Sequence, residues 1–392
     1  MIDVGSIRAE TPGCQESIHF NSAGAALMPQ QVLDAQISYL RDEARYGGYE
    51  AYNRNEEAQE DVYASLARLI GGEADEIAQM ENSTRAWDMV FYGIKLRAGD
   101  RILTSRVDYD SNFVAYLQRC RQTGAVVEIV PTLATGEVDV EALDGMIDER
   151  VRLVSISHAP TSNGLINPAE EIGQVARARN VPYLLDACQT VGHMPIDVRK
   201  IGCSFLTSAG RKFLRGPRGT GFLWVRRDLI ASTEPAFVDF HSAAWVADNR
   251  YQLRADARRF EAWEGNFAAR FGLRTAARYM MDIGIAESFH YIQALAERLR
   301  RGLAQLPGVA ITDQGRTRSG IVTFSVAGQT PETVKARLAE QGVAVSTATC
   351  QSSRLSMVPR GLIEGVTRAS VHHYNTDEEV ERFTGLVRKL FC

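Results

Sequence analysis

The sequence predicts an α/β protein with a large, mainly parallel-sheet domain and a smaller α+β domain at its C-terminal end. With 392 residues the chain exceeds the usual length of one domain, and its 45% hydrophobic residues suffice for a large core. From about residue 60 onward, short apolar runs alternate with segments of helical period, as strands and helices do around a parallel sheet. We therefore expect a large domain over 1–265, whose N-terminal segment contributes to the small domain, and a small domain over 266–392.

The expected strands of the large domain are the apolar runs 101–104, 126–130, 153–157, 183–185, 205–207 and 221–225. Between two of them, the stretch 168–178 places Ile172, Val175 and Ala176 on one helical face. Ligands bind beyond the carboxyl ends of the strands in such sheets, so the residues just after each run are candidates for a site. The stretch 237–266 mixes polar and aromatic residues without a period, and we interpret it as a loop and connecting segment.

In the small domain a long helix is expected after residue 266, followed by short strands and capped helices. The expected strands are 321–326, 343–346 and 366–371. Thr330 is the predicted cap of a helix whose first residue is Pro331. Thr376 and Glu379 form a predicted capping box at the start of the final helix. The apolar face of that helix comprises Val380, Phe383, Val387 and Leu390.

Composition and charge exclude several classes of function. The net charge of −4, from 44 basic and 48 acidic residues, gives no indication of a nucleic-acid or anionic-membrane partner. No stretch approaches the ~20 apolar residues of a membrane span, and the N-terminus has no secretory signal pattern. The six cysteines are scattered without a CxxC pair, which argues against a metal site or a disulfide framework. We expect a reducing, cytoplasmic location and no metal.

Asp186 is the first candidate for chemistry, because it ends the apolar run 183–185. One interpretation is that Asp186 caps the next helix. The other is that a carboxylate at the end of a buried strand pairs with a buried cation, such as a protonated pyridine nitrogen. The residues alone leave both interpretations open.

Lys212 follows about 25 residues later, just past the run 205–207. Small residues precede it and Phe213 and Leu214 follow it, which is an awkward setting for a solvated lysine. Desolvation lowers the pKa of an amine and makes it a nucleophile for an aldehyde. The neighbouring Arg211 is suited to bind a phosphate oxygen.

A third candidate lies at the start of a predicted helix whose apolar face contains Trp87, Val90, Phe91 and Ile94. Ser83 or Thr84 occupies the position where this helix begins. An ordinary helix cap explains these residues, and so does a phosphate held by free N–H groups and hydroxyls. Both explanations remain open at this point.

Taken together in order, the segments NSTRAWD, RVDYDSN, SHAPTSNG, LLDACQTVGH, SAGRKFLRGPRGTG and TRASVHHYNT resemble the class V aminotransferases. The resemblance runs from about His19 to the C-terminus. It implies a fold-type I enzyme that depends on pyridoxal 5′-phosphate and acts on an amino acid. It also implies a homodimer with both active sites at the interface.

The resemblance implies specific roles for residues of this chain. Lys212 would carry the cofactor as an imine and move the α-proton, Asp186 would pair with the pyridinium nitrogen, and Tyr109 would stack on the ring. The full set of expected cofactor contacts is Lys212, Ser83, Thr84, Arg85, Tyr109, Thr161, Asp186, Gln189 and Arg211. Arg368, Asn163 and Tyr49 are the expected substrate-binding residues, with Arg368 holding the α-carboxylate.

These residues determine the cofactor more clearly than they determine which reaction the enzyme catalyses. The segment around Tyr46–Tyr52 and the loop near Cys350 resemble the isopenicillin N epimerase-like and sulfoxide C–S lyase branch. This favours a C–S lyase that performs β-elimination on a cysteine S-conjugate or sulfoxide. The alternatives are an aminotransferase or epimerase, a cysteine desulfurase with Cys350 as the nucleophile, and a non-catalytic binding module with the same fold.

Overall fold

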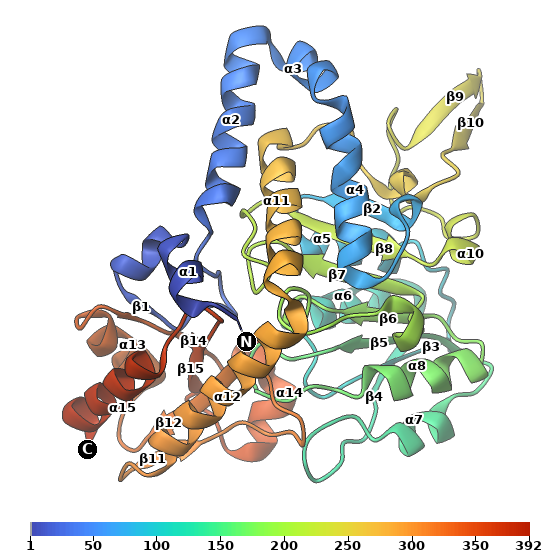
Figure 1. Cartoon of the computed structure of the whole chain (residues 1–392). Helices are drawn as coiled ribbons and strands as arrows, with labels where there is room; N and C mark the ends of the chain where they lie inside the picture. Colours follow the sequence, from blue (N-terminus) through green and yellow to red (C-terminus); the bar gives the residue numbers. More distant parts are fainter. Residues whose placement is uncertain (1) are drawn as a thin grey trace.

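The computed structural model describes residues 2–392, with the large sheet and the smaller one in different parts of the molecule (Figure 1). The large sheet has seven strands in the order β2-β8-β7-β6-β5-β3-β4. Their bounds are β2 (Ile77–Met80), β3 (Arg101–Thr104), β4 (Val126–Ile129), β5 (Val151–Ser157), β6 (Tyr183–Asp186), β7 (Phe205–Ala209) and β8 (Gly221–Val225). Strands β3 to β7 are parallel, and β8 is antiparallel to both β2 and β7. The predicted α/β class with a mainly parallel sheet is confirmed.

Helices cover both faces of the large sheet, as the alternation within β6 shows. Tyr183 and Leu185 pack in one apolar cluster and Leu184 packs in another. The first cluster is shared by α4 (Glu56–Ile70), α8 (Ala169–Ala178), α9 (Val198–Ile201) and α11 (Phe267–Ile283), and the second by α5 (Ser83–Phe91), α6 (Asp110–Thr123) and α10 (Arg227–Ile230). The short elements α7 (Val140–Met146) and η2 (Ala74–Glu76) complete this part. Burial of both faces explains why the strands are almost continuously apolar.

The small part is a four-stranded antiparallel sheet in the order β11-β12-β15-β14. Its strands are β11 (Val309–Ile311), β12 (Ile321–Val326), β14 (Ser346–Ala348) and β15 (Val366–Ser370), and its helices are α12 (Ile285–Ala304), α13 (Pro331–Ala339), α14 (Arg354–Met357) and α15 (Asp377–Phe391). The caps predicted for α13 and α15 are confirmed, since Thr330 accepts from Thr333 N and Thr376 and Glu379 form the capping box. The 3₁₀ turns η4 (Gln351–Ser353) and η5 (Val358–Arg360) flank α14.

The N-terminal segment completes the small part. After α1 (Val4–Ala9) and η1 (Pro12–Gln15), β1 (Ile18–His19) pairs in parallel with β13 (Val343–Ala344). Ile18 and Phe20 lie in the apolar cluster that holds Leu299, Phe324 and Phe383. Residues 18–20 therefore lie in the same core as the helix α15.

The packing of α11 bears on where the two parts divide. Leu273 and Met280 of this helix belong to the core of the large sheet, and α11 packs on α4 and on α2 (Gln30–Tyr46). At Gly284 the backbone takes a φ of +90°, and the next helix joins the small core. The boundary expected at residue 265 does not fit this packing, and we propose that the division falls at Gly284.

The segment 237–266, expected to be a loop, contains a β-hairpin. Strands β9 (Ala243–Ala247) and β10 (Arg250–Leu253) pair antiparallel and project from the body, and η3 (Ala257–Phe260) follows (Figure 1). Nearly every residue of the hairpin is exposed, so the sequence carries no alternation between a buried and an exposed face. A second projection is formed by the far end of α2 and by α3 (Gly48–Arg54).

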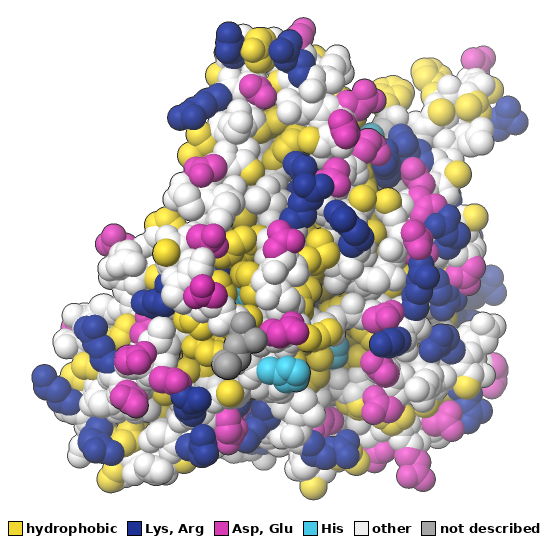
Figure 2. Space-filling model, viewed as in Figure 1, with side chains coloured by type: hydrophobic (Ala, Val, Ile, Leu, Met, Phe, Trp, Pro, Cys, Tyr) yellow, Lys and Arg dark blue, Asp and Glu magenta, His cyan; other side chains and the backbone are white. Residues whose placement is uncertain are grey.

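The surface mixes charges of both signs. On the face shown in Figure 2, lysine and arginine side chains are interspersed with aspartate and glutamate, and apolar side chains are visible on the projecting hairpin. Within residues 2–392, no helix combines the length and the apolar character needed to cross a membrane.

Candidate active site

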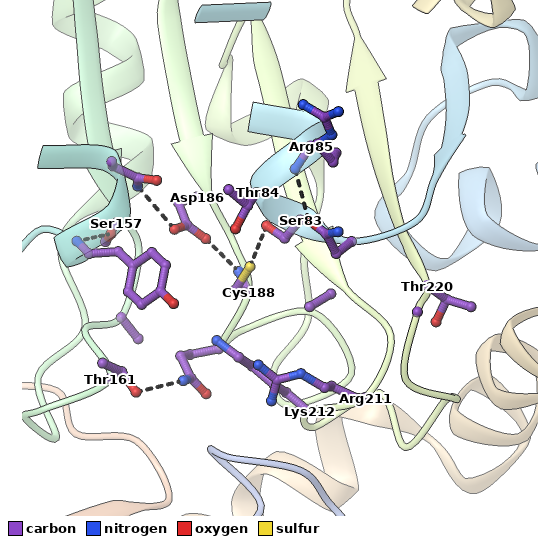
Figure 3. Close-up of a pocket in the computed structure, with 17 residues that line it drawn as sticks. Ser83, Thr84, Arg85, Ser157, Thr161, Asp186, Cys188, Arg211, Lys212 and Thr220 are labelled. Carbon is purple, nitrogen blue, oxygen red and sulfur yellow. Dashed lines mark hydrogen bonds between the residues drawn. The ribbon is translucent and has the colours of Figure 1, made fainter. Parts of the chain in front are cut away.

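A pocket of about 520 Å³ lies at the carboxyl ends of β5, β6 and β7, beside the start of α5 (Figure 3). Every residue expected to contact the cofactor lines it: Ser83, Thr84, Arg85, Tyr109, Thr161, Asp186, Gln189, Arg211 and Lys212. The lining also includes residues to which the sequence analysis assigned no role: Asn82, Asn112, Ser157, Ala159, Cys188, Ala209, Gly219 and Thr220. The pocket thus occupies the edge of the sheet where ligands of α/β proteins bind.

Lys212 lies in the turn after β7 and is only 8% exposed. The turn requires glycine at position 210, because a Cβ there would lie 2.2 Å from Thr220 Oγ1. Burial lowers the pKa of the Lys212 amine, an effect that the neighbouring Asp186 partly opposes. The Nζ atom is 5.8 Å from the centroid of the Tyr109 ring. A desolvated amine facing an aromatic ring is suited to hold an aldehyde as an imine.

Arg215 fixes the turn from behind. It is fully buried with a φ of +63°, a left-handed conformation that non-glycine residues rarely adopt, and its N–H donates to Lys212 O at 2.9 Å. Its guanidinium donates to Leu27 O at 2.8 Å, contacts His373 Nε2 at 2.9 Å and donates to Thr11 Oγ1 at 2.5 Å. These partners lie 158 to 204 residues away, so no local sequence signal identifies this role.

Asp186 ends β6 with its carboxylate in the pocket (Figure 3). Oδ1 accepts from Cys188 N at 3.0 Å, and Oδ2 accepts from Asn112 Nδ2 at 3.3 Å. The next helix, α9, begins only at Val198, so the alternative that Asp186 caps a helix is wrong. The carboxylate is held in place and is oriented to pair with a cation in the pocket.

The first turn of α5 offers a site for an anion. The cap is Asn82, whose Oδ1 accepts from Arg85 N at 2.9 Å, and not Ser83 or Thr84 as one interpretation had it. Ser83 and Thr84 instead lie in the first turn, where N–H groups have no acceptor within the helix. A Cβ at Gly221 would lie 2.9 Å from Ser83 N, so glycine allows β8 to pass directly under the helix start.

The two arginines among the expected cofactor contacts are placed differently. In Figure 3 Arg211 lies beside Lys212, and the charge of Arg211 helps to lower the pKa of that lysine. The guanidinium of Arg85 lies at the other side of the view and stacks over the exposed Phe237 ring, 5.4 Å from its centroid. Of the two, Arg211 is the cation close to the reacting amine.

Arg368 reaches the pocket region from β15 of the small part and is 6% exposed. Nη1 donates to Thr161 O and Oγ1 at 3.0 and 2.5 Å, and Nη2 donates to Asn21 Oδ1 at 3.3 Å. All these partners are neutral, and Nε is buried without an acceptor among the described residues. Burial and the nearby charge of Arg211 lower the pKa of Arg368 to about 10. A buried guanidinium with neutral partners alone is a site for a carboxylate.

Besides Arg368, three predicted residues do not line the pocket. Asn163 is buried, but its Oδ1 accepts from Gln314 N at 2.7 Å and its Nδ2 donates to Gln314 Oε1 at 3.2 Å, so this neighbour occupies both amide groups. The substrate contact expected of Asn163 is therefore not supported. Tyr49 is 71% exposed on α3, at the tip of the helical projection. Cys350 directly precedes η4 without a capping hydrogen bond and packs with Met357 in a small apolar cluster.

Cys188 and Asn112 are polar residues of the pocket to which the sequence assigned no role, because their partners Ser83 and Asp186 lie 105 and 74 residues away along the chain. Cys188 lies two residues after Asp186, and its Sγ donates to Ser83 Oγ at 2.7 Å. Burial raises the pKa of the Cys188 thiol to about 12, so it stays a neutral donor. Asn112 follows Tyr109 by one helical turn, which is the spacing that brings both to the same side of α6.

These groups fit pyridoxal phosphate. The start of α5 and Arg211 suit the phosphate, Asp186 suits the ring nitrogen, and Lys212 suits the aldehyde. Gln189 adds an observation of its own. Its Nε2 donates to Ala23 O and Thr161 Oγ1, whereas its buried Oε1 has no partner within residues 2–392 and is free to accept from the ring hydroxyl.

Comparison with known proteins identifies the family of the chain. The family model for class-V aminotransferases matches residues 18–383. A probable cysteine desulfurase of Methanothermobacter thermautotrophicus is 29% identical over 96% of this chain and 95% of its own length. One from Xylella fastidiosa is 31% identical over 98% of this chain and 95% of its own length.

Solved structures of similar fold include a further cysteine desulfurase. The apo cysteine desulfurase of Thermococcus onnurineus NA1 superposes with a TM-score of 0.92 at 27% identity, covering 100% of this chain and 98% of that one. C-DES, with glycine covalently linked to its PLP cofactor, shares the fold at a TM-score of 0.87 and 23% identity, covering 97% and 98%. The chain therefore belongs to the class-V aminotransferase family and is an enzyme whose cofactor is pyridoxal 5′-phosphate.

Proposed function

We propose that this enzyme is a cysteine desulfurase, which transfers the sulfur of L-cysteine to Cys350 and releases alanine. The names of the relatives support this reaction over the β-elimination of a cysteine S-conjugate that the sequence favoured. The structural observation that carries the proposal is the juxtaposition of Arg368, a buried carboxylate site, with the loop that bears Cys350.

That loop is attached to the rim of the pocket. Strand β14 pairs with β15, so that Ser346 lies opposite Arg368, and the chain continues from β14 into the Cys350 loop. Ser353 Oγ then donates to Ser162 Oγ at 2.6 Å, directly after Thr161 of the pocket lining. The loop that carries Cys350 thus bridges from the substrate-carboxylate site to the pocket rim.

The residues divide the work of such a reaction. When bound, the cofactor supplies an electron sink that makes the α-proton of the amino acid acidic. Arg368 binds the substrate carboxylate, and Lys212 accepts the α-proton as a neutral amine. The Cys350 thiolate attacks the substrate sulfur. The C–S bond breaks, an S–S bond forms, and protonation of the carbon skeleton gives alanine, so that cysteine and the Cys350 thiol become alanine and a persulfide.

The test is to incubate the purified holoenzyme with L-cysteine and to measure alanine and protein-bound persulfide. Cys350→Ser is expected to lose both products while it keeps the visible absorbance of the lysine-bound cofactor. Cys120→Ser is the matched control, because Cys120 is also free and partly exposed but lies on α6. Undiminished alanine formation by Cys350→Ser would contradict the desulfurase.

A second candidate is β-elimination from a cysteine-derived substrate. It is favoured by the packing of Cys350 with Met357 and Val366, away from the pocket lining. This reaction would give pyruvate from cystine or a cysteine sulfoxide, independently of Cys350. An aminotransferase would instead require an added keto acid, and an epimerase would change only the optical rotation of the amino acid.

We further propose a homodimer that works in the cytoplasm. The hairpin region exposes large apolar side chains that a partner subunit would cover: Phe237, Val238, Phe240, Trp245, Val246 and Tyr251. All six cysteines are free, which suits a reducing compartment. Sedimentation of the holoenzyme checks the dimer, and a monomer at micromolar concentration would contradict it.

A further inference from the structure

A second carboxylate lies directly behind Asp186. Asp108 occupies the turn between β3 and α6, and it does not line the pocket. Five donors surround its side chain: Thr104 Oγ1 at 2.6 Å, Ser157 Oγ at 2.6 Å, Tyr116 Oη at 2.7 Å, Tyr109 N at 2.7 Å and Asn112 Nδ2 at 3.3 Å. So many donors to one carboxylate hold it in a single orientation.

Asn112 connects the two carboxylates. Its Nδ2 is 3.3 Å from Asp108 Oδ1 and 3.3 Å from Asp186 Oδ2, and the residue is 4% exposed. An ionised carboxylate only accepts, so one hydrogen of the amide is directed to each side and the amide cannot turn over without losing both contacts. Asp108 therefore sets the orientation of Asn112, and Asn112 sets the orientation of Asp186.

Asp108 also holds the aromatic wall of the pocket. It accepts from the N–H of Tyr109, the residue at the start of α6 whose ring faces Lys212. Ser157 Oγ lies 3.2 Å from the same N–H and donates to Asp108 in turn. The ring that stacks on the cofactor and the carboxylate that pairs with its nitrogen thus share one anchor.

The cluster is not a simple hydrogen-bonded filler. Burial and the charge of Asp186 raise the pKa of Asp108, while the hydroxyls of Ser157, Thr104 and Tyr116 act in the opposite direction. Placing two carboxylates on either side of one amide is unfavourable unless a cation compensates for them. A protonated ring nitrogen beside Asp186 is such a cation.

We propose that Asp108 is a positioning residue, which acts through Asn112 to make the pocket selective for a cofactor ring with a protonated nitrogen. The inference rests on the proposed pairing of Asp186 with that nitrogen. It extends this pairing to a residue that touches neither cofactor nor substrate.

The experiment compares the affinity of the cofactor-free protein for pyridoxal phosphate and for the analogue in which the ring nitrogen is replaced by carbon. The wild type is expected to prefer pyridoxal phosphate, and Asp186→Asn is expected to lose the preference. Asp108→Asn and Asn112→Ala are each expected to reduce the preference by roughly tenfold through weaker binding of pyridoxal phosphate alone, as for a lost charge-assisted contact.

Asp100→Asn is the matched control. Asp100 is a buried carboxylate at the opposite end of β3, where it pairs with Arg152, and its loss is expected to leave the preference unchanged. The double variant Asp108→Asn with Asp186→Asn is expected to bind both ligands as Asp186→Asn does, which general destabilisation would not produce.

The outcomes separate this inference from the assignments beneath it. A full preference for pyridoxal phosphate in both Asp108→Asn and Asn112→Ala, together with its loss in Asp186→Asn, would overturn the role of Asp108 alone. Equal binding of both ligands by the wild type would contradict the proposed pairing of Asp186 with the ring nitrogen. It would therefore also overturn the inference about Asp108. Neither result affects the test of the desulfurase reaction, in which Cys350 accepts the sulfur and alanine is released.

Discussion

Two regions of the molecule meet at Thr161 and Ser162. One consists of the strand ends with Lys212 and Asp186, and the other is the loop with Cys350. They differ in how firmly the surrounding structure supports them. The strand ends are buried, and a glycine turn, Arg215 and the Asp108 cluster fix them from behind. The loop consists of short turns between β14 and β15, and it is attached to the pocket rim by single hydrogen bonds. The contrast teaches that the cofactor pocket is rigidly supported by the fold, whereas the loop proposed to select the reaction has few supports.

The largest effect is expected at the strand ends. Lys212→Ala removes the amine that we propose binds the cofactor and moves the α-proton, so turnover should fall by at least about 10³-fold. The visible absorbance of the bound cofactor should disappear in the same variant. Substantial activity in Lys212→Ala would contradict the assignment of the cofactor chemistry to the strand ends.

Arg368 tests the boundary between the two regions. Arg368→Ala should lower kcat/KM for the amino acid by roughly 10²-fold, because the substrate carboxylate loses a buried charged partner. Arg368→Lys should recover only a part of this, since an ammonium cannot bind a carboxylate in the bidentate manner of a guanidinium. The cofactor spectrum without substrate should persist in both, and an unchanged KM would contradict the assignment.

Acid should loosen the strand ends through His193. Its Nδ1 donates to Gln189 O and its Nε2 accepts from Gly320 N, so only the neutral ring satisfies both contacts. Burial lowers the pKa of His193 to about 4. The unfolded chain, with an ordinary pKa of about 6.5, therefore binds more protons between these values, and stability falls with falling pH by about 2 kcal/mol at pH 5.

Urea unfolding of the wild type and of His193→Gln at pH 7 and pH 5 measures the contribution of His193 to this loss of stability. The variant is expected to lose about 2 kcal/mol less on acidification than the wild type does. Equal losses in the two proteins would show that His193 does not carry this dependence.

The smallest effect is expected in the loop. Ser353→Ala removes the hydrogen bond to Ser162 and should slow persulfide formation on Cys350 roughly threefold, while cofactor binding stays unchanged. Single-turnover measurements with L-cysteine separate the two steps. A change in the cofactor spectrum of Ser353→Ala would mean that loop and strand ends are coupled more tightly than their construction indicates.

The sequence predicted what depends on neighbours along the chain. Asp186 and Lys212 follow buried apolar runs, so their place at the edge of a parallel sheet could be inferred from pattern alone. Arg215 and Asn112 could not be assigned roles, since their partners lie up to 204 and 74 residues away. Asn163 lies outside the pocket lining, two residues after Thr161 in the same turn, and contacts Gln314 instead.

The hairpin was missed for a different reason. Its strands β9 and β10 are exposed on both faces, so they lack the period of two that burial imposes on one side of a strand. Pairing between backbones forms the hairpin, and backbone pairing leaves little trace in side-chain polarity.

The contacts of Arg215 have a consequence for biosynthesis. The turn that presents Lys212 is held through this arginine by Thr11 and Leu27 near the start of the chain and by His373 near its end. During translation the large sheet can form as soon as its strands have left the ribosome, but this turn has its full set of supports only when residue 373 has emerged. We therefore expect the enzyme to capture its cofactor only after residue 373 has emerged, and chains truncated before this residue to be released without it.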